Sequence, residues 1–191
     1  EIVVTAQRRE QRLQDVPISV SAFNQEILQQ SGISDSTELE LVTPGLTLPS
    51  AAIYLQPMIR GVGSYNTHVG DEPNVATYID GVYISQMFGG FYNLANVERI
   101  EVLKGPQGTL FGRNATGGAI NVKTRDPGQD LEGMVSLSYG RFNSIEANAY
   151  VQGGLGEGLA ASLAGYYEYG DGYFHNVALN KREGGLKSYT L

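Results

Sequence analysis

The sequence of 191 residues contains no cysteine and no tryptophan, and its only two histidines are His68 and His175. The absence of cysteine excludes disulfides, thiolate catalysis and cysteine-ligated metals. The two histidines lie too far apart in the sequence to have ligand-like spacing, so we expect neither a metal site nor a cofactor. No run of 18 apolar residues is present, and the sequence therefore predicts no transmembrane helix.

Positive charge is also scarce. Thirteen Lys and Arg residues stand against twenty Asp and Glu residues, which gives a net charge of −7. Because nucleic-acid binding needs a basic face, this balance argues against a nucleic-acid partner. Glycine, in contrast, is abundant: the 25 glycines make up about 13% of the chain, against ~7% in average proteins. Dense glycine between strands predicts tight turns and close backbone packing.

The densest glycine segment spans Val97–Thr124 and reads VERIEVLKGPQGTLFGRNATGGAINVKT. Its first part alternates in character as a strand does. One side of that strand carries Val97, Arg99, Glu101 and Leu103. Five glycines follow between residues 105 and 118, and Ala119–Thr124 alternates again as a second strand. A P-loop would need Lys-Ser/Thr directly after its glycines, and none follows here, so a nucleotide-binding enzyme is disfavoured.

This segment and three others, taken in order, closely resemble the plug domain of TonB-dependent outer-membrane receptors. The matching motifs are IVVTA at residues 2–6, IRG at 59–61, NVATYIDGVY at 74–83 and VLKGPQGTLFGRNATGGAINV at 102–122. The resemblance implies an α+β plug domain, with a small mixed sheet and short helices. It implies no catalysis. We interpret the carboxylates of Asp71, Glu72, Glu98 and Glu101 as solvated or latch groups, not as an acid–base pair.

Within the plug region, sequence patterns predict individual elements. Asn24 is expected to cap a helix that ends near Gln30, and Ser34 or Asp35 to cap a second helix that ends near Val42. The dipeptide Asp80-Gly81 is a strong hairpin signal. Strands are expected at Val16–Phe23 and at Ile53–Arg60, the second with an interruption at Pro57. The hairpin is expected at Val75–Ile84, and a helical turn at Asn93–Asn96.

From residue 131 onward the composition shifts to small residues and tyrosines with a period of two. Segments of about ten residues with alternating character are typical of transmembrane β-barrel strands, although a soluble meander with one wet face gives the same pattern. In the membrane interpretation, the lipid-facing residues are Leu131, Val135, Leu137, Ile145, Ala147, Val151, Leu159 and Leu163.

These patterns divide the chain into four parts. We expect a TonB-box and linker segment at 1–15, a plug domain at 16–125, a linker at 126–130, and the first three to four antiparallel strands of a barrel at 131–191. Members of the resembled family close a barrel of ~22 strands, so we expect a truncated receptor with an incomplete β-barrel. The alternative is a soluble binding or interaction module without transport activity.

The resemblance also implies functional roles for two sets of residues. Ile2, Val3, Val4, Thr5 and Ala6 match the TonB box. An extended pentad on a mobile tail could add as a strand to the sheet edge of TonB. Arg60 and Lys104 match the plug cations that are expected to pair with carboxylates on the inner barrel wall. The family usually has Arg at the second position, and Lys104 offers a point charge in place of a planar fork.

Substrate contacts are expected from two outward loops of the plug. The candidates are Tyr65, Asn66, His68, Gln86, Phe88 and Tyr92. Aromatic and amide groups suit a metal chelate whose metal is already saturated, and an iron-siderophore is the family's commonest cargo. The implied partners are TonB with ExbB and ExbD, and outer-membrane lipid. The implied location is the outer membrane of a Gram-negative bacterium, as a monomer, with the N-terminal segment and plug facing the periplasm.

Overall fold

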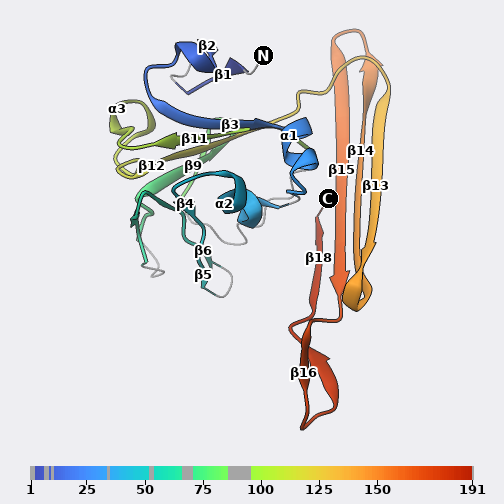
Figure 1. The fold of residues 1–191 in the computed structure, drawn as a ribbon. Coiled ribbons are helices and arrows are strands. Elements are labelled where there is room, and N and C mark those ends of the chain that lie inside the picture. Colours follow the sequence, from blue (N-terminus) through green and yellow to red (C-terminus); the bar gives the residue numbers. More distant parts are fainter. Residues whose placement is uncertain are drawn as a thin grey trace. The chain divides into compact units, whose positions relative to one another are not determined.

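The structure is a computed structural model that describes residues 3–6, 9, 11–33, 35–51, 54–65, 71–85 and 96–190. The chain divides between Arg125 and Asp126 into two compact units. The first unit contains a mixed sheet with short helices, and the second contains an antiparallel sheet (Figure 1). None of the helices in the described ranges has the length and apolar character needed to span a lipid bilayer.

A five-stranded sheet forms the centre of the first unit. Its strands, in spatial order, are β10 (Val82–Ile84), β9 (Val75–Ile79), β12 (Gly118–Thr124), β11 (Val97–Lys104) and β3 (Ser19–Asn24). Strands β12 and β9 run parallel, and every other neighbouring pair is antiparallel. This mixed sheet confirms the α+β class predicted for the plug region.

The helices of this unit are short. They are α1 (Gln25–Gln30), α2 (Leu39–Val42) and α3 (Gly108–Phe111), with 3-10 turns at Leu13–Asp15 and Ser36–Glu38. Asn24 caps α1 as predicted, because its Oδ1 accepts a hydrogen bond of 2.9 Å from the Ile27 N–H. Asp35 and Glu38 form a capping box before α2. The helical turn α3 inside the glycine-rich segment was not predicted.

The strand predicted at residues 53–60 with an interruption at Pro57 is divided at this proline into two short strands. Residues 53–60 do not form a continuous strand, because β6 (Tyr54–Leu55) and β7 (Met58–Ile59) belong to different small sheets. Pro57 lies between them and has no N–H for a sheet ladder. The other short strands are β1 (Val3–Val4), β2 (Gln11–Arg12), β4 (Leu46–Thr47), β5 (Ser50–Ala51) and β8 (Val62–Gly63).

The central sheet has a core on each face, because side chains alternate along a strand. On one face, Ile100 and Val102 of β11 pack with Leu28 of α1 and Leu39 of α2. On the other face, Leu103 packs in a second core with the N-terminal segment and α3. In Figure 1, the N-terminal segment lies on one side of the sheet and α2 and β4 lie on the other.

The predicted Asp80-Gly81 hairpin turn is confirmed, with φ of 47° and 79°, as a type I′ turn requires. Asp80 accepts hydrogen bonds from the Thr124 N–H (2.9 Å) and hydroxyl (2.6 Å). Burial opposes ionisation of Asp80, but these bonds and the nearby Lys123 ammonium outweigh burial and lower the pKa of its carboxyl. The ionised carboxylate therefore stabilises the folded state.

The lowered pKa of Asp80 makes the stability of the first unit depend on pH. The contribution of Asp80 is complete above the unfolded pKa of ~3.9 and is lost as the pH falls through the lower folded pKa. We expect Asp80→Asn, which tolerates the same left-handed backbone, to flatten the acid loss of stability. The difference should be below about 1 kcal/mol because the group is partly exposed. Urea unfolding at neutral and acid pH measures it, with Asp71→Asn as control. If Asp80→Asn lost as much unfolding free energy between neutral and acid pH as the unmodified chain, Asp80 would not be the source of this pH dependence.

The second unit is a four-stranded antiparallel sheet with a small hairpin. Its strands, in spatial order, are β13 (Glu132–Gly140), β14 (Ser144–Gly156), β15 (Leu159–Gly170) and β18 (Leu186–Thr190). The hairpin consists of β16 (Phe174–Asn176) and β17 (Lys181–Glu183), and a 3-10 turn at Arg141–Asn143 joins β13 to β14. Antiparallel strands are therefore present where the alternating sequence pattern predicted them.

Candidate functional site

The predicted TonB box lies docked on the central sheet of the first unit. Val3 and Val4 form β1, which pairs antiparallel with the two residues of β2. Val4 and Ala6 are completely buried, with 0% exposure, in the second core. Ile2 lies outside the described residues. The expectation that this pentad forms a mobile tail is therefore wrong for Val3–Ala6.

A buried carboxylate holds the segment at Thr5. Glu101 is 0% exposed, and its Oε1 accepts hydrogen bonds from the Thr5 N–H at 2.7 Å and the Thr5 hydroxyl at 3.0 Å. The amide of Asn121 donates to the Thr5 hydroxyl oxygen at 3.2 Å and to Glu101 Oε2 at 3.4 Å. Since Asn121 stands opposite Glu101 in the pairing of β11 and β12, the sheet register itself brings these groups together.

Arg99 balances the charge of Glu101. Its Nε donates to Glu101 Oε1 at 2.9 Å, and its other side forms an ion pair with Glu98. Burial of Arg99 opposes its charge, but the bonds to Glu101 and Glu98 outweigh this effect and raise the pKa of the guanidinium. Interpreting Glu101 as a solvated group was therefore wrong: it is an internal anion that binds the N-terminal segment. Of the two carboxylates that contact Arg99, Glu98 is the exposed one and Glu101 is the buried one.

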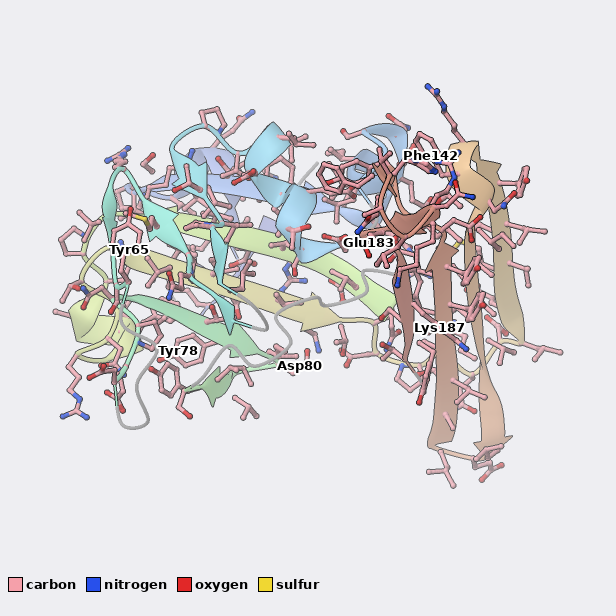
Figure 2. The ribbon with its side chains drawn as sticks, turned by 90° about the horizontal axis from the view of Figure 1, so that it is seen from below. Tyr65, Tyr78, Asp80, Phe142, Glu183 and Lys187 are labelled. Carbon is pink, nitrogen blue, oxygen red and sulfur yellow. The ribbon has the colours of Figure 1, made fainter. Side chains whose placement is uncertain are left out.

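A cavity of about 360 Å³ opens beside this network. Its lining combines the polar groups of the network with the aromatic rings of Tyr78 and Phe111 and with the β9–β10 turn. Figure 2 labels Tyr78 and Asp80, which mark this side of the sheet. The cavity lets water reach Thr5 without unfolding of the sheet.

The two predicted latch residues lie close to each other. Arg60 donates through Nη2 to the Ser19 hydroxyl at 3.1 Å, and Ser19 pairs with Lys104 across β3 and β11. Desolvation, and then the charge of Arg60, lower the pKa of Lys104. Within the described part of the chain, no carboxylate forms an ion pair with either cation. Arg60 also occupies a left-handed backbone conformation, φ 52°, at the turn between β7 and β8, a position where strain often accompanies function.

Of the six residues predicted to contact substrate, the structure describes Tyr65. Tyr65 is 69% exposed, and its carbonyl oxygen accepts a hydrogen bond of 3.1 Å from Gln56 Nε2. The remaining candidates, Asn66, His68, Gln86, Phe88 and Tyr92, lie outside the described residues. In the ranges that are described, no group of three acidic or histidine side chains is arranged to hold a metal ion.

Two functional residues escaped the sequence-based prediction, Arg99 and Asn121. A signal for Arg99 was present, because Arg99 and Glu101 alternate onto the same side of β11 as the apolar Leu103. The expectation that Val97 shares this side is wrong: a β-bulge between Val97 and Arg99 places Val97 in the other core, with Ile100. Charged residues on an otherwise apolar face are buried only when they are paired. The partner across the sheet, however, depends on strand register, which the sequence alone does not give.

Comparison with known proteins identifies the family of the first unit. The family model described as "TonB-dependent Receptor Plug Domain" matches residues 12–119. The chain is 34% identical to the iron-regulated outer membrane virulence protein of Vibrio cholerae over 176 residues, which is 86% of this chain and 27% of that protein. It is 30% identical to the vitamin B12 transporter BtuB of Vibrio vulnificus over 183 residues, which is 90% of this chain and 28% of that protein.

A solved structure agrees as well. The crystal structure of the ferric yersiniabactin uptake receptor FyuA from Yersinia pestis superimposes with a TM-score of 0.79 at 28% identity, covering 90% of this chain and 27% of FyuA. The chain thus spans roughly a quarter of the length of the curated relatives it matches. These relatives are receptors and transporters, which confirms the prediction that the chain is not an enzyme. The chain belongs to the family of TonB-dependent receptor plug domains.

Proposed function

We propose that the whole protein is a TonB-dependent outer-membrane receptor that imports a metal chelate, and that residues 2–6 are the strand that TonB takes. One observation carries this proposal: the segment is buried but weakly integrated. Its strand β1 is two residues long, and within the described ranges its one partner strand is β2. The backbone N–H of Thr5 donates to the side chain of Glu101. A segment held in this way can leave without dismantling the central sheet.

We propose a ferric siderophore as the first candidate cargo. Support comes from relatives named as an iron-regulated outer membrane protein and as a ferric yersiniabactin uptake receptor. The similarity to a vitamin B12 transporter keeps cobalamin as the alternative. The exposed ring of Tyr65 is a described apex group that could contact such a chelate.

In the proposed mechanism, cargo binding from outside favours release of residues 2–6 into the periplasm. TonB, energised through ExbB and ExbD, pairs with the released strand and pulls the plug. Arg60 and Lys104 act as the latch, since two neighbouring cations need an anion from elsewhere. We propose carboxylates of the surrounding barrel wall in a monomeric receptor as that anion.

The second unit is proposed to belong to the membrane-spanning barrel wall. Its register aligns those predicted lipid-facing residues that lie in β13, β14 and β15 on one face. Val135 (81%) and Leu137 (75%) on this face are highly exposed, as is Leu131 (84%) just before β13. The opposite face is polar and internally hydrogen-bonded, as between Tyr150 and Gln152 at 2.8 Å. An apolar face this contiguous is unusual for a soluble module, which disfavours that alternative.

A peptide that covers residues 1–11 tests the proposed function. We expect it to bind the purified periplasmic domain of TonB, and Val4→Pro to weaken binding at least about tenfold, because proline removes a backbone donor and strand geometry. Isothermal titration calorimetry measures both affinities, with an established TonB-box peptide as positive control. If the native peptide fails to bind while the control binds, residues 2–6 are only a structural strand of the plug.

A further inference from the structure

Two arginines stack on one phenyl ring at one end of the second unit. The guanidinium carbon of Arg141 lies 4.7 Å from the centroid of Phe142, and that of Arg182 lies 4.8 Å from it. Arg141 comes from the turn between β13 and β14, and Arg182 comes from β17 of the hairpin. Both side chains are exposed. A guanidinium stacked by its face keeps its in-plane N–H groups available for an anion.

Asp171, which directly follows β15, fixes the Arg141–Asn143 turn to the end of that strand. Its carboxylate accepts hydrogen bonds from the Asn143 amide at 2.5 Å and the Tyr169 hydroxyl at 2.7 Å. Its backbone N–H donates to the Phe142 carbonyl at 3.0 Å. Phe142 and Asn143 both have left-handed backbones, with φ of 65° and 54°. Such conformations are costly for a phenylalanine and persist only where the surroundings fix them, so the ring is held in place for both arginines.

This cationic cluster adjoins an aromatic row on the apolar face. The register aligns Tyr139, Ile145, Tyr169 and Lys187 in one row across the four strands. The next row inward contains Leu137, Ala147, Tyr167 and Tyr189. Tyrosines with cations just beyond them are the arrangement expected where an apolar surface meets lipid headgroups. Figure 2 labels Phe142 and Lys187 on the second unit.

Charge is unevenly divided between the two ends of the sheet. At the end with the Phe142 turn, the connecting segments 141–143 and 171–187 carry Arg141, Lys181, Arg182 and Lys187 against Asp171 and Glu183. Glu146 and Glu168, one residue inward on β14 and β15, lie on the opposite, polar face of the sheet. The opposite end carries Asp126, Asp130, Glu132 and Glu157, and residues 126–132 and 153–161 contain no Lys or Arg. The cationic end therefore complements an anionic surface, and its position at the border of the apolar face favours a lipid over a free solute.

We propose that Arg141 and Arg182, preorganised on Phe142, form a site for the phosphate groups of anionic lipid headgroups. This inference rests on the proposed function, because it requires the apolar face of the second unit to contact lipid. The two guanidinium carbons are less than about 10 Å apart, since each lies under 5 Å from the same ring centroid. They can therefore act on one headgroup, where arginine pairs bidentately with phosphate oxygens.

Flotation of the full chain with vesicles tests the site. Vesicles of phosphatidylcholine alone are compared with vesicles that also contain phosphatidylglycerol. We expect preferential association with the anionic vesicles, weakened roughly fivefold in Arg141→Gln and in Arg182→Gln. Arg113→Gln, which removes an 85% exposed arginine of the first unit, is the matched control and should leave the preference unchanged. Phe142→Leu keeps both charges and should also reduce the preference.

Other outcomes overturn the inference in distinguishable ways. Equal loss in Arg113→Gln, or no loss in Phe142→Leu, indicates diffuse charge attraction and no built site. Full displacement of the chain by inorganic phosphate indicates a phosphate-ion site instead of a lipid site. If Leu137→Ser and Val135→Ser change association with neither kind of vesicle, the membrane placement itself fails. Association that depends on these apolar residues but not on the arginines contradicts the phosphate site alone.

Discussion

Replacement of Glu101 by alanine is expected to free the N-terminal segment from the plug. The substitution removes the acceptor for the Thr5 N–H, the Thr5 hydroxyl, Arg99 Nε and the Asn121 amide at once. Breaking a buried charge pair by removing one partner costs roughly 3–5 kcal/mol. Because Arg99 keeps its ion pair with Glu98, the free energy of unfolding should fall by an amount near the lower end of that range.

A single spin label measures this release. The chain contains no cysteine, so Val3→Cys provides one labelling site, on a side chain that is 42% exposed. We expect an immobilised spectrum in the otherwise unchanged chain and a mobile one in Glu101→Ala. Glu98→Ala is the matched control, because it removes a carboxylate from the same strand that contacts Arg99 but not Thr5. Equal mobility in both variants would show that the bond to Thr5 does not hold the segment.

Gly118→Ala is expected to destabilise the first unit severely. An added Cβ would lie 2.3 Å from the Leu103 carbonyl oxygen and 2.8 Å from Ile59 Cδ1, and φ at this position is +148°. The carbonyl belongs to the neighbouring strand β11 and cannot move away without loss of sheet pairing. We expect a loss on the order of 3 kcal/mol from strain and overpacking together, seen as a lower urea midpoint.

Alanine substitutions at two other glycines distinguish backbone strain from overpacking as the cause of this loss of stability. Gly108 has no atom within 4 Å of a built Cβ and an ordinary φ, and Gly105 has equally open space but a φ of +100°. Gly108→Ala should change stability by less than about 0.5 kcal/mol. Gly105→Ala should cost an intermediate amount, from backbone strain alone. If all three variants unfold at the same urea concentration, close packing at Gly118 is not the reason for that glycine.

Local signals in the sequence predicted the local elements of the plug. Asn24 and Asp35 cap their helices because side-chain acceptors near unsatisfied N–H groups act over three residues. Asp80-Gly81 makes its turn because both residues tolerate a left-handed backbone. The strand expected at residues 53–60 with an interruption at Pro57 divides at that proline into β6 and β7, but the sequence did not show that the two pieces join different sheets. The position of a proline was a better guide than hydrophobicity.

The site was predicted in part. The motif at residues 2–6 identified the segment, but its docking depends on contacts that are distant in sequence: Thr5 and Glu101 are separated by 96 residues. Burial of Glu101 follows from the pairing register of β11 with β12 and from coverage by the N-terminal segment, and neither can be inferred from strand periodicity. The neighbourhood of Arg60 and Lys104 likewise arises because β3 places Ser19 between them.

The most direct test of the account compares TonB binding by the free peptide 1–11, by the full chain and by the full chain with Glu101→Ala. Docking buries Val4 and occupies the Thr5 N–H, so docking and strand addition to TonB exclude each other. We predict that the peptide and the Glu101→Ala chain bind TonB more tightly than the unmodified chain. If spin labelling shows release in Glu101→Ala and yet TonB binds that chain no better, the docked segment is not the strand that TonB takes.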